Sequence, residues 1–197
     1  MSERWRLFIG LLLPAETRAA LVAVQTALRS QPLAVRWTRP ENLHITLHFL
    51  GDINSDYVTA LQSSLDSGLQ GHRAPLIACT TLGAFPNEGR PRVLWAGPTR
   101  VPPELLHLNE VAVAAGGTVG VAPEERAYHP HMTLGYVHER ATAAERTACG
   151  RAIQTADTPQ DAGRPYPTVA LIRSVLGRDG ATYTPLVTWT LPAATAP

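Results

Sequence analysis

The chain has 197 residues, of which 45% are hydrophobic and 17% are charged, and its formal net charge is +1. This composition is that of a globular domain, and it excludes a disordered chain and a strongly basic nucleic-acid coat. All 17 basic residues are arginines, which excludes a lysine Schiff base, a P-loop lysine and a lysine-adenylate ligase. Cys79 and Cys149 are too few for a disulfide framework, so we expect two thiols in a reducing compartment or one bridge.

The N-terminal apolar run at 7–13 follows two arginines and ends at Pro14, so it has two interpretations. It is at the short limit for the apolar region of a signal peptide, and we therefore expect a buried first strand. No stretch of the chain approaches the ~18 apolar residues of a transmembrane helix. We expect a cytoplasmic protein that does not bind membranes.

The rest of the chain alternates short strands and helices. In the first half of the chain, apolar periodicity and turn residues predict a strand at 6–13, a helix at 14–30, an extended piece at 34–37, a strand at 43–50, and a helix that begins near 54–55. An apolar run at 75–83, a loop at 85–91, a strand at 92–96 and a helix at 102–117 follow. The last part is predicted to hold a strand at 130–137, a helix at 142–153, a linker at 155–167, and strands at 168–176 and 182–191. This alternation indicates an α+β fold with antiparallel or mixed sheets.

One pattern occurs twice, 87 residues apart, in predicted strands. Residues 42–48 read Asn-Leu-His-Ile-Thr-Leu-His, and residues 129–135 read His-Pro-His-Met-Thr-Leu-Gly. Since alternate residues of a strand point to the same face, His44 and Thr46 share one face and the apolar residues take the other. His131 and Thr133 follow the same rule. We therefore expect two similar lobes, each of which contributes one His/Thr pair to a shared cleft.

Two imidazoles and two hydroxyls suit the attack of water on a phosphodiester. One histidine accepts the proton of the water and the other protonates the leaving oxygen, while the hydroxyls donate to the phosphate oxygens. This chemistry requires neither a metal nor a nucleotide cofactor. On a strand, the Cα atoms of His44 and His48 are about 13 Å apart, too far to share one metal ion. His129 and His131 are a better chelating pair, but no third ligand is evident, so we expect no metal site.

The two motifs belong to a longer ordered set that resembles the two-histidine (2H) phosphoesterases. Within that superfamily the chain is similar to the bacterial and archaeal RNA 2′,3′-cyclic phosphodiesterases, also described as 2′-5′ RNA ligases. The resemblance extends over essentially the whole chain. It is carried by the segments 6–9, 13–14, 36–52, 83–86, 90–95 and 130–134.

The resemblance implies a single bilobal α+β catalytic domain over 1–197, with two pseudo-twofold-related lobes of mostly antiparallel sheet, helices outside and a central cleft. It implies metal-independent hydrolysis of RNA 2′,3′-cyclic phosphate ends to 2′-phosphates, with weak reverse 2′-5′ ligation. Carried over by position, His44 would be the proton donor and His131 the proton acceptor, and Thr46 and Thr133 would hold phosphate oxygens. We expect no cofactor, no obligate protein partner and a monomer.

The chain departs from the family pattern at Gly135-Tyr136, where many relatives carry arginine shortly after the second motif. We expect Arg39 or Arg92 to meet the phosphate charge instead. These two belong to a candidate basic rim for RNA phosphates, whose members are Arg36, Arg39, Arg90, Arg92 and Arg126.

Three aromatic side chains are candidates for stacking a terminal base, namely Tyr136, Trp37 and Phe85. Alternation along its strand places Phe49 on the apolar face, so we expect this side chain in the core.

Two alternatives remain open. The same site could act on small cyclic nucleotides, ADP-ribose cyclic phosphate or 2′-5′ oligonucleotides, which the dependence of kcat/KM on chain length would separate. The chain could instead bind RNA ends without turnover, and Tyr136 is the feature that favours this second alternative.

Overall fold

The computed structural model describes residues 3–177 and 180–193, and its core is built on two four-stranded antiparallel sheets. The first sheet has the order β10-β9-β1-β3, with β1 at Arg4–Leu12, β3 at His44–Asn54, β9 at Thr168–Gly177 and β10 at Gly180–Thr190. The second has the order β2-β7-β6-β5, with β2 at Val35–Trp37, β5 at Thr81–Phe85, β6 at Val93–Gly97 and β7 at Met132–Val137. The α+β class is confirmed.

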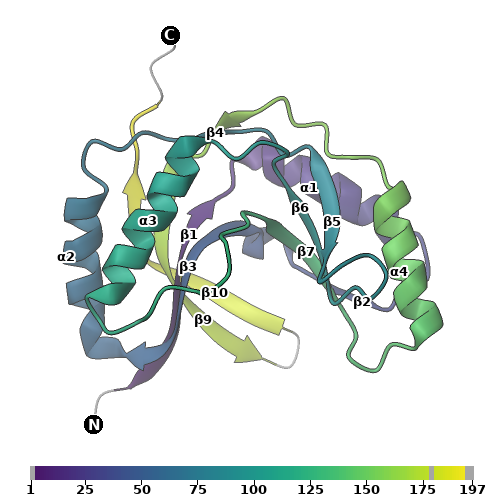
Figure 1. Cartoon of the computed structure of the whole chain (residues 1–197), viewed down its shortest axis with the longest axis horizontal. Helices are drawn as coiled ribbons and strands as arrows, with labels where there is room; N and C mark the ends of the chain where they lie inside the picture. Colours follow the sequence, from purple (N-terminus) through teal and green to yellow (C-terminus); the bar gives the residue numbers. More distant parts are fainter. Residues whose placement is uncertain (1–2, 178–179, 194–197) are drawn as a thin grey trace.

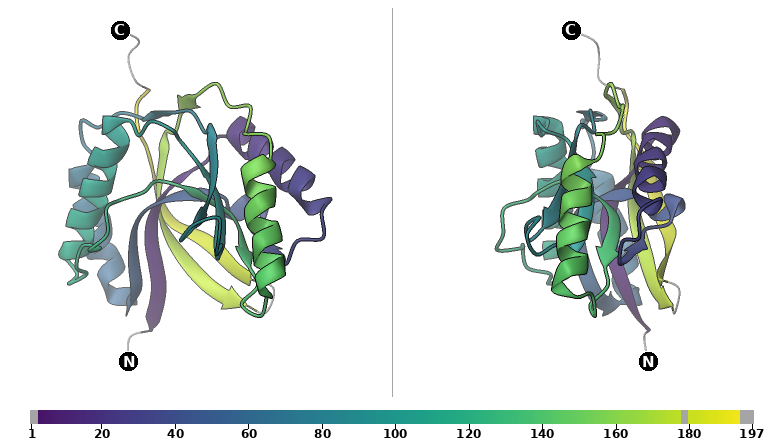
Figure 2. Two further views of the ribbon diagram at one scale, coloured as in Figure 1. Left: turned by 45° about the vertical axis from the view of Figure 1, so that its right-hand side comes forward. Right: turned by 90° about the vertical axis from the view of Figure 1, so that its right-hand side faces the viewer.

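In the described part of the chain, four helices flank the two sheets (Figure 1). Their bounds are Ala15–Arg29 (α1), Val58–Gly68 (α2), Pro103–Gly117 (α3) and Ala143–Thr155 (α4), and two single 3₁₀ turns occur at Pro40–Asn42 and Ser55–Tyr57. The left view of Figure 2 shows α2 and α3 on one flank, α1 and α4 on the other, and the strands between them. Among the described residues, no helix is long and apolar enough to cross a membrane.

The first predicted strand is confirmed as β1, which lies inside the first sheet between β3 and β9. Leu7, Ile9 and Leu11 of this strand have no exposed surface. The chain then crosses to the second sheet as α1. Gln25 on the buried face of α1 donates from its Nε2 to the carbonyl oxygens of Thr38 and Leu134, at 2.9 and 2.8 Å. These bonds hold α1 on the second sheet, close to the second motif.

A β-bulge in β3 overturns the prediction for Phe49. Gly10 of β1 pairs with Thr46 and Ile9 pairs with His48, which leaves Leu47 as an extra residue in β3. Because a bulge shifts the alternation by one residue, His48 turns into the core and Phe49 turns out. The Phe49 side chain is 37% exposed, and its ring lies under the Arg6 guanidinium at 4.5 Å.

Side chains from neighbouring elements satisfy the carbonyl groups at this bulge. Asn109 of α3 donates to the Leu47 carbonyl at 2.7 Å, and the Tyr128 hydroxyl donates to the Thr46 carbonyl at 3.0 Å. The bulge is therefore built into the fold. It leaves His44 and Thr46 on the side of β3 that Phe49 also faces, since all three line one pocket.

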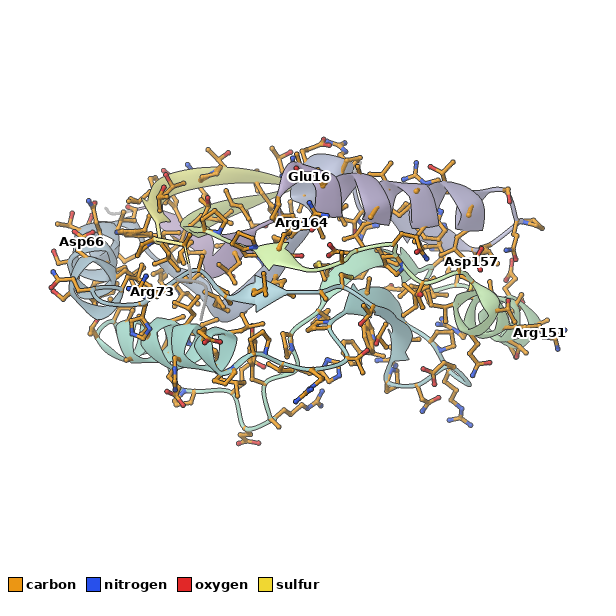
Figure 3. The ribbon with its side chains drawn as sticks, turned by 90° about the horizontal axis from the view of Figure 1, so that it is seen from above. Glu16, Asp66, Arg73, Arg151, Asp157 and Arg164 are labelled. Carbon is orange, nitrogen blue, oxygen red and sulfur yellow. The ribbon has the colours of Figure 1, made fainter. Side chains whose placement is uncertain are left out.

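The segment 155–167 is more than the linker that the sequence predicted. Its Arg164–Pro165 strand (β8) pairs with Leu76–Ile77 (β4), and Tyr166 is fully buried. The Asp161 carboxylate, with a side chain of 0% exposure, accepts from the Thr17 hydroxyl, the Cys79 backbone N–H and the Arg164 guanidinium at 3.1–3.3 Å. Figure 3 shows Arg164 close to Glu16 of α1, with which it forms an ion pair at 3.5 Å. Composition did not reveal this buried polar cluster.

The two cysteines are both free and both buried. Burial is the main cause that raises the pKa of the Cys79 thiol to about 12, and the nearby Asp161 carboxylate adds to the shift. Cys149 has a raised pKa for the same first reason. Of the two sequence-based alternatives, the structure therefore holds two thiols and no bridge.

Candidate active site

The two histidine motifs meet at one pocket between the sheets, with a volume of about 550 Å³. β3 contributes His44 and Thr46 to its lining. Thr133 comes from β7, and His131 immediately precedes that strand. The two pairs come from different sheets, and β3 and β7 lie side by side. Neither half of the chain holds both pairs.

His44 is held by a backbone carbonyl and by packing. Its Nδ1 lies 2.7 Å from the carbonyl oxygen of Asn42, and its Nε2 lies 3.0 Å from the Thr46 hydroxyl. The carbonyl can only accept, so Nδ1 carries the proton and Nε2 is the nitrogen available for chemistry. The rings of Phe8 and Tyr183 pack against the imidazole at 4.7 and 5.2 Å. A Cβ at Gly10 would lie 3.0 Å from the Ile45 carbonyl oxygen, so the glycine allows β1 and β3 to approach closely beside this ring.

His131 repeats the arrangement of His44 from the second sheet. Its Nδ1 lies 2.8 Å from the carbonyl oxygen of His129, again two residues earlier in the chain. This bond also leaves Nε2 as the reactive nitrogen. The Phe85 ring meets the imidazole edge to face at 4.9 Å. The two histidines therefore have the same tautomer and the same backbone anchor.

Burial lowers the pKa of both imidazoles. The pKa of His44 falls from 6.5 to about 4, mainly because burial disfavours the charged ring, and the nearby His131 lowers it further. The bond to Asn42 acts in the opposite direction. The pKa of His131 is also lowered, first by burial. Both rings are therefore mainly neutral at pH 7.

The pocket is strongly positive. Arg6, Arg36 and Arg39 line it, and none of the described lining residues is acidic. Arg6 forms a long, partly exposed ion pair with Asp52 at 3.9 Å, and Arg36 lies over the Tyr136 ring at 5.0 Å. A phosphate anion in this pocket meets cations and no carboxylate, which favours its binding and raises the pKa of the adjacent imidazoles.

The structure brings together most of the site residues that the sequence predicted. Arg39, Trp37 and Tyr136 line the pocket beside the two histidine motifs. Arg92 and Phe85 do not line it. Both line a larger neighbouring groove that also reaches His131 and Thr133, and Arg92 lines a second groove as well. Within the larger groove, the Phe85 ring contacts the His131 ring.

Sequence reasoning missed one wall of the pocket. This wall is the β9–β10 hairpin together with the inner face of β1, and its lining residues are Arg6, Phe8, Ser174, Leu176, Gly177, Gly180, Ala181 and Tyr183. Asn42 donates from its Nδ2 to the Ala181 carbonyl at 2.7 Å and so fixes the hairpin beside the first motif. Alternation along β1 places Arg6 and Phe8 on one face, but no local pattern indicates that β10 returns to this position.

Metal ligands are scarce around the pocket. Within 3–177 and 180–193, no group of three His, Cys, Asp or Glu side chains has an arrangement that could hold a metal ion. The rings of His129 and His131, the chelating pair considered from the sequence, have centroids 6.3 Å apart.

Residues 11–95 match the family model described as LigT like Phosphoesterase. A relative from Escherichia coli, named RNA 2′,3′-cyclic phosphodiesterase, is 34% identical over 134 residues, which cover 68% of this chain and 73% of that protein. A protein of the same name from Thermus thermophilus is 32% identical over 203 residues, covering 94% of this chain and 90% of that protein.

Two solved structures superpose on nearly the entire chain. E. coli LigT complexed with 3′-AMP matches with a TM-score of 0.77 at 27% identity and covers 96% of this chain and 99% of that one. A Thermus thermophilus protein matches with a TM-score of 0.79 at 27% identity, with 96% and 100% covered. Two sheets that each present a His-x-Thr pair to one pocket define a two-histidine phosphoesterase. The chain belongs to the family of LigT-like phosphoesterases.

Proposed function

We propose that this phosphoesterase hydrolyses the 2′,3′-cyclic phosphate at RNA ends to a 2′-phosphate without a metal ion. The observation that carries the proposal is the matched pair of imidazoles in one cationic pocket, each anchored through Nδ1 to a carbonyl and each beside a threonine. The relatives named RNA 2′,3′-cyclic phosphodiesterase support the choice of substrate. The two free, buried thiols suit the reducing cytoplasm, where we place the reaction.

In the proposed mechanism, His131 accepts a proton from water, and the resulting oxygen attacks the phosphorus. The bond from phosphorus to the 3′ oxygen breaks, and protonated His44 donates the proton on its Nε2 to that oxygen. The Thr46 and Thr133 hydroxyls donate to the phosphate oxygens as their charge develops. The products are a 2′-phosphate and a 3′-hydroxyl. An RNA 5′-hydroxyl in the place of water would give a weak 2′-5′ ligation at the same site.

We propose that 1–197 form a single catalytic domain. The proton donor and the acceptor come from different sheets, so both sheets are needed for one site. The decisive experiment is hydrolysis of an oligoribonucleotide with a 2′,3′-cyclic phosphate end in excess EDTA, with the phosphate position identified in the product. We expect a 2′-phosphate. A 3′-phosphate, or activity only with added metal, would contradict the mechanism, and tight binding without product would indicate an RNA-end-binding module.

The pH dependence of kcat/KM follows from the lowered pKa values. Catalysis needs neutral His131 and protonated His44, so the optimum for the free enzyme lies between their two pKa values. Since burial places both pKa values below 6.5, we expect an optimum on the acid side of pH 6.5 and a tenfold fall per pH unit well above it. Bound phosphate raises both pKa values, so the optimum of kcat should lie at higher pH. A flat profile from about pH 5 to 8.5, with chemistry rate-limiting, would contradict this assignment.

The role of the Thr133 hydroxyl can be tested without a change in side-chain size. Thr133→Val keeps the volume and the β-branched shape but removes the donor, and we expect kcat to fall by about 10²-fold, as for other oxyanion donors. Thr133→Ser retains the hydroxyl and should keep most of the activity. Steady-state kinetics of both variants separate the hydroxyl from packing. Equal activity of the valine and serine variants would remove this hydroxyl from the mechanism.

A further inference from the structure

A second basic groove lies next to the catalytic pocket. We call it the arginine groove. It has a volume of about 610 Å³, and its charged lining consists of Arg36, Arg92 and Arg146 together with Glu139. Three guanidinium groups against one carboxylate make the groove cationic. None of the reaction steps proposed above uses it.

Tyr136 and Arg36 join the arginine groove to the catalytic pocket, since both line the two spaces. They are paired across neighbouring strands, β2 and β7, and the guanidinium lies 5.0 Å from the centre of the phenol ring. The Tyr136 side chain is 39% exposed. An anionic chain that leaves the catalytic pocket at this point would pass an aromatic ring and a cation, the two groups that hold single-stranded nucleic acid.

The charges of the arginine groove are available to a ligand. Arg146 donates to the carbonyl oxygens of Pro91, His138 and Glu139 at 2.8–3.1 Å, which positions the guanidinium and leaves its charge unneutralised. Arg92 is exposed, and no acidic side chain of the described residues forms an ion pair with it. Phosphate is the anion that several guanidinium groups recognise best.

A second groove also adjoins the catalytic pocket, and it is less suited to a polyanion. This larger groove of about 1,220 Å³ also reaches His131 and Thr133, but Glu110 and Glu124 line it together with Arg92 and Arg126. Its charges therefore balance. A phosphodiester backbone would therefore find no net attraction in the larger groove, whereas the excess of arginines would attract it along the arginine groove.

We propose that the arginine groove binds the phosphates of the nucleotides that precede the cyclic end, so that the preferred substrate is an oligoribonucleotide and not a cyclic mononucleotide. This inference rests on the proposed function. Tyr136 would then stack a base at the border of the two spaces. Arg36 would be the cation nearest to the first internucleotide phosphate.

The test compares kcat/KM for cytidine 2′,3′-cyclic monophosphate with kcat/KM for a pentaribonucleotide that ends in the same cyclic nucleotide. For the unmodified protein we expect the pentanucleotide to be favoured at least tenfold. In Arg92→Ala this ratio should fall about tenfold, the effect of losing roughly one phosphate contact, and Arg92→Lys should restore part of it. Arg151→Ala removes an exposed arginine of α4 at the edge of the molecule (Figure 3) that lines neither groove, and it is the control that should keep the ratio. Because Arg92 lines both grooves, Arg126→Ala, which removes an exposed arginine that lines only the larger one, is a second control and should also keep the ratio.

Salt dependence distinguishes a phosphate contact from a structural effect. For single strands, each neutralised phosphate contributes about −0.7 to the slope of log affinity against log salt. The slope measured with the pentanucleotide should therefore become shallower by about 0.7 in Arg92→Ala and stay unchanged in Arg151→Ala. A pentanucleotide-to-mononucleotide ratio near one in the unmodified protein, or an Arg92→Ala ratio and slope equal to those of the control, would overturn the inference. Failure to hydrolyse either substrate would remove the proposed function and the inference with it.

Discussion

Replacement of His44 or His131 by alanine is expected to lower kcat/KM by at least about 10²-fold, the typical contribution of a positioned general acid or base. Each ring has one nitrogen bonded to a backbone carbonyl and the other available in the pocket, and no other described histidine or carboxylate lines that pocket. A substitute for either proton-transfer group is therefore absent from the described lining. Hydrolysis of a cyclic-phosphate-ended oligonucleotide in EDTA measures the loss directly.

The double variant sharpens this prediction. Groups that act as a unit give non-additive losses, so His44→Ala combined with His131→Ala should be little worse than either single variant. His107→Ala is a suitable control because this histidine is exposed on α3 and lines neither the catalytic pocket nor the two neighbouring grooves. Near-full activity of either single variant would remove that histidine from the mechanism. A loss of equal size in the control would point to an effect on folding.

Asp161→Ala is expected to lower the free energy of unfolding by about 3 kcal/mol, because it leaves buried donors and a partly buried guanidinium without their carboxylate. The Thr17 hydroxyl, the Cys79 N–H and Arg164 all bond to this side chain. For a domain of this length, the change corresponds to a fall in Tm of roughly 10 °C. Thermal or denaturant unfolding measures it.

Asp157→Ala is the matched control for this substitution. Asp157 lies in the same segment but is exposed, and Figure 3 shows it well away from Arg164. Its loss should change stability by no more than about 0.5 kcal/mol. Asp161→Asn keeps an acceptor oxygen and should fall between the two. Equal stability of the Asp161 and Asp157 alanine variants would show that the buried cluster does not hold 155–167 against the core.

Much of the fold was predictable because local patterns act over short distances. The apolar run at 6–13 became the inner strand β1. The loop predicted at 85–91 begins at the last residue of β5 and otherwise lies between β5 and β6. The helix predicted at 102–117 is α3, and its buried residues include Leu105 and Leu108. Element type follows from periodicity, which a single stretch of sequence contains in full.

Phe49 is a residue for which periodicity predicted the wrong face of the strand. Alternation assigned this side chain to the core, but the extra residue at Leu47 reverses the faces, and that bulge depends on the pairing with β1 and on Asn109 of α3. Asp161 is a second case, because a carboxylate in a segment rich in Pro and Gly is typical of an exposed loop. Only its distant donors, Thr17 and Cys79, make it a buried anchor.

The sequence by itself determined the α+β class, the two His-x-Thr pairs and the family, because the residues that carry them are contiguous or recur in a repeated motif. Tertiary structure decided which cations line the pocket between the two histidines. Of the two arginines expected from the sequence to meet the phosphate charge, Arg39 lines this pocket and Arg92 lines the neighbouring grooves. Arg36, a member of the candidate basic rim, and Arg6, which was not a candidate, also line the pocket. These positions depend on the pairing of β1 with β3 and of β2 with β7. Such long-range register is set by the packing of the whole chain, and no local pattern encodes it.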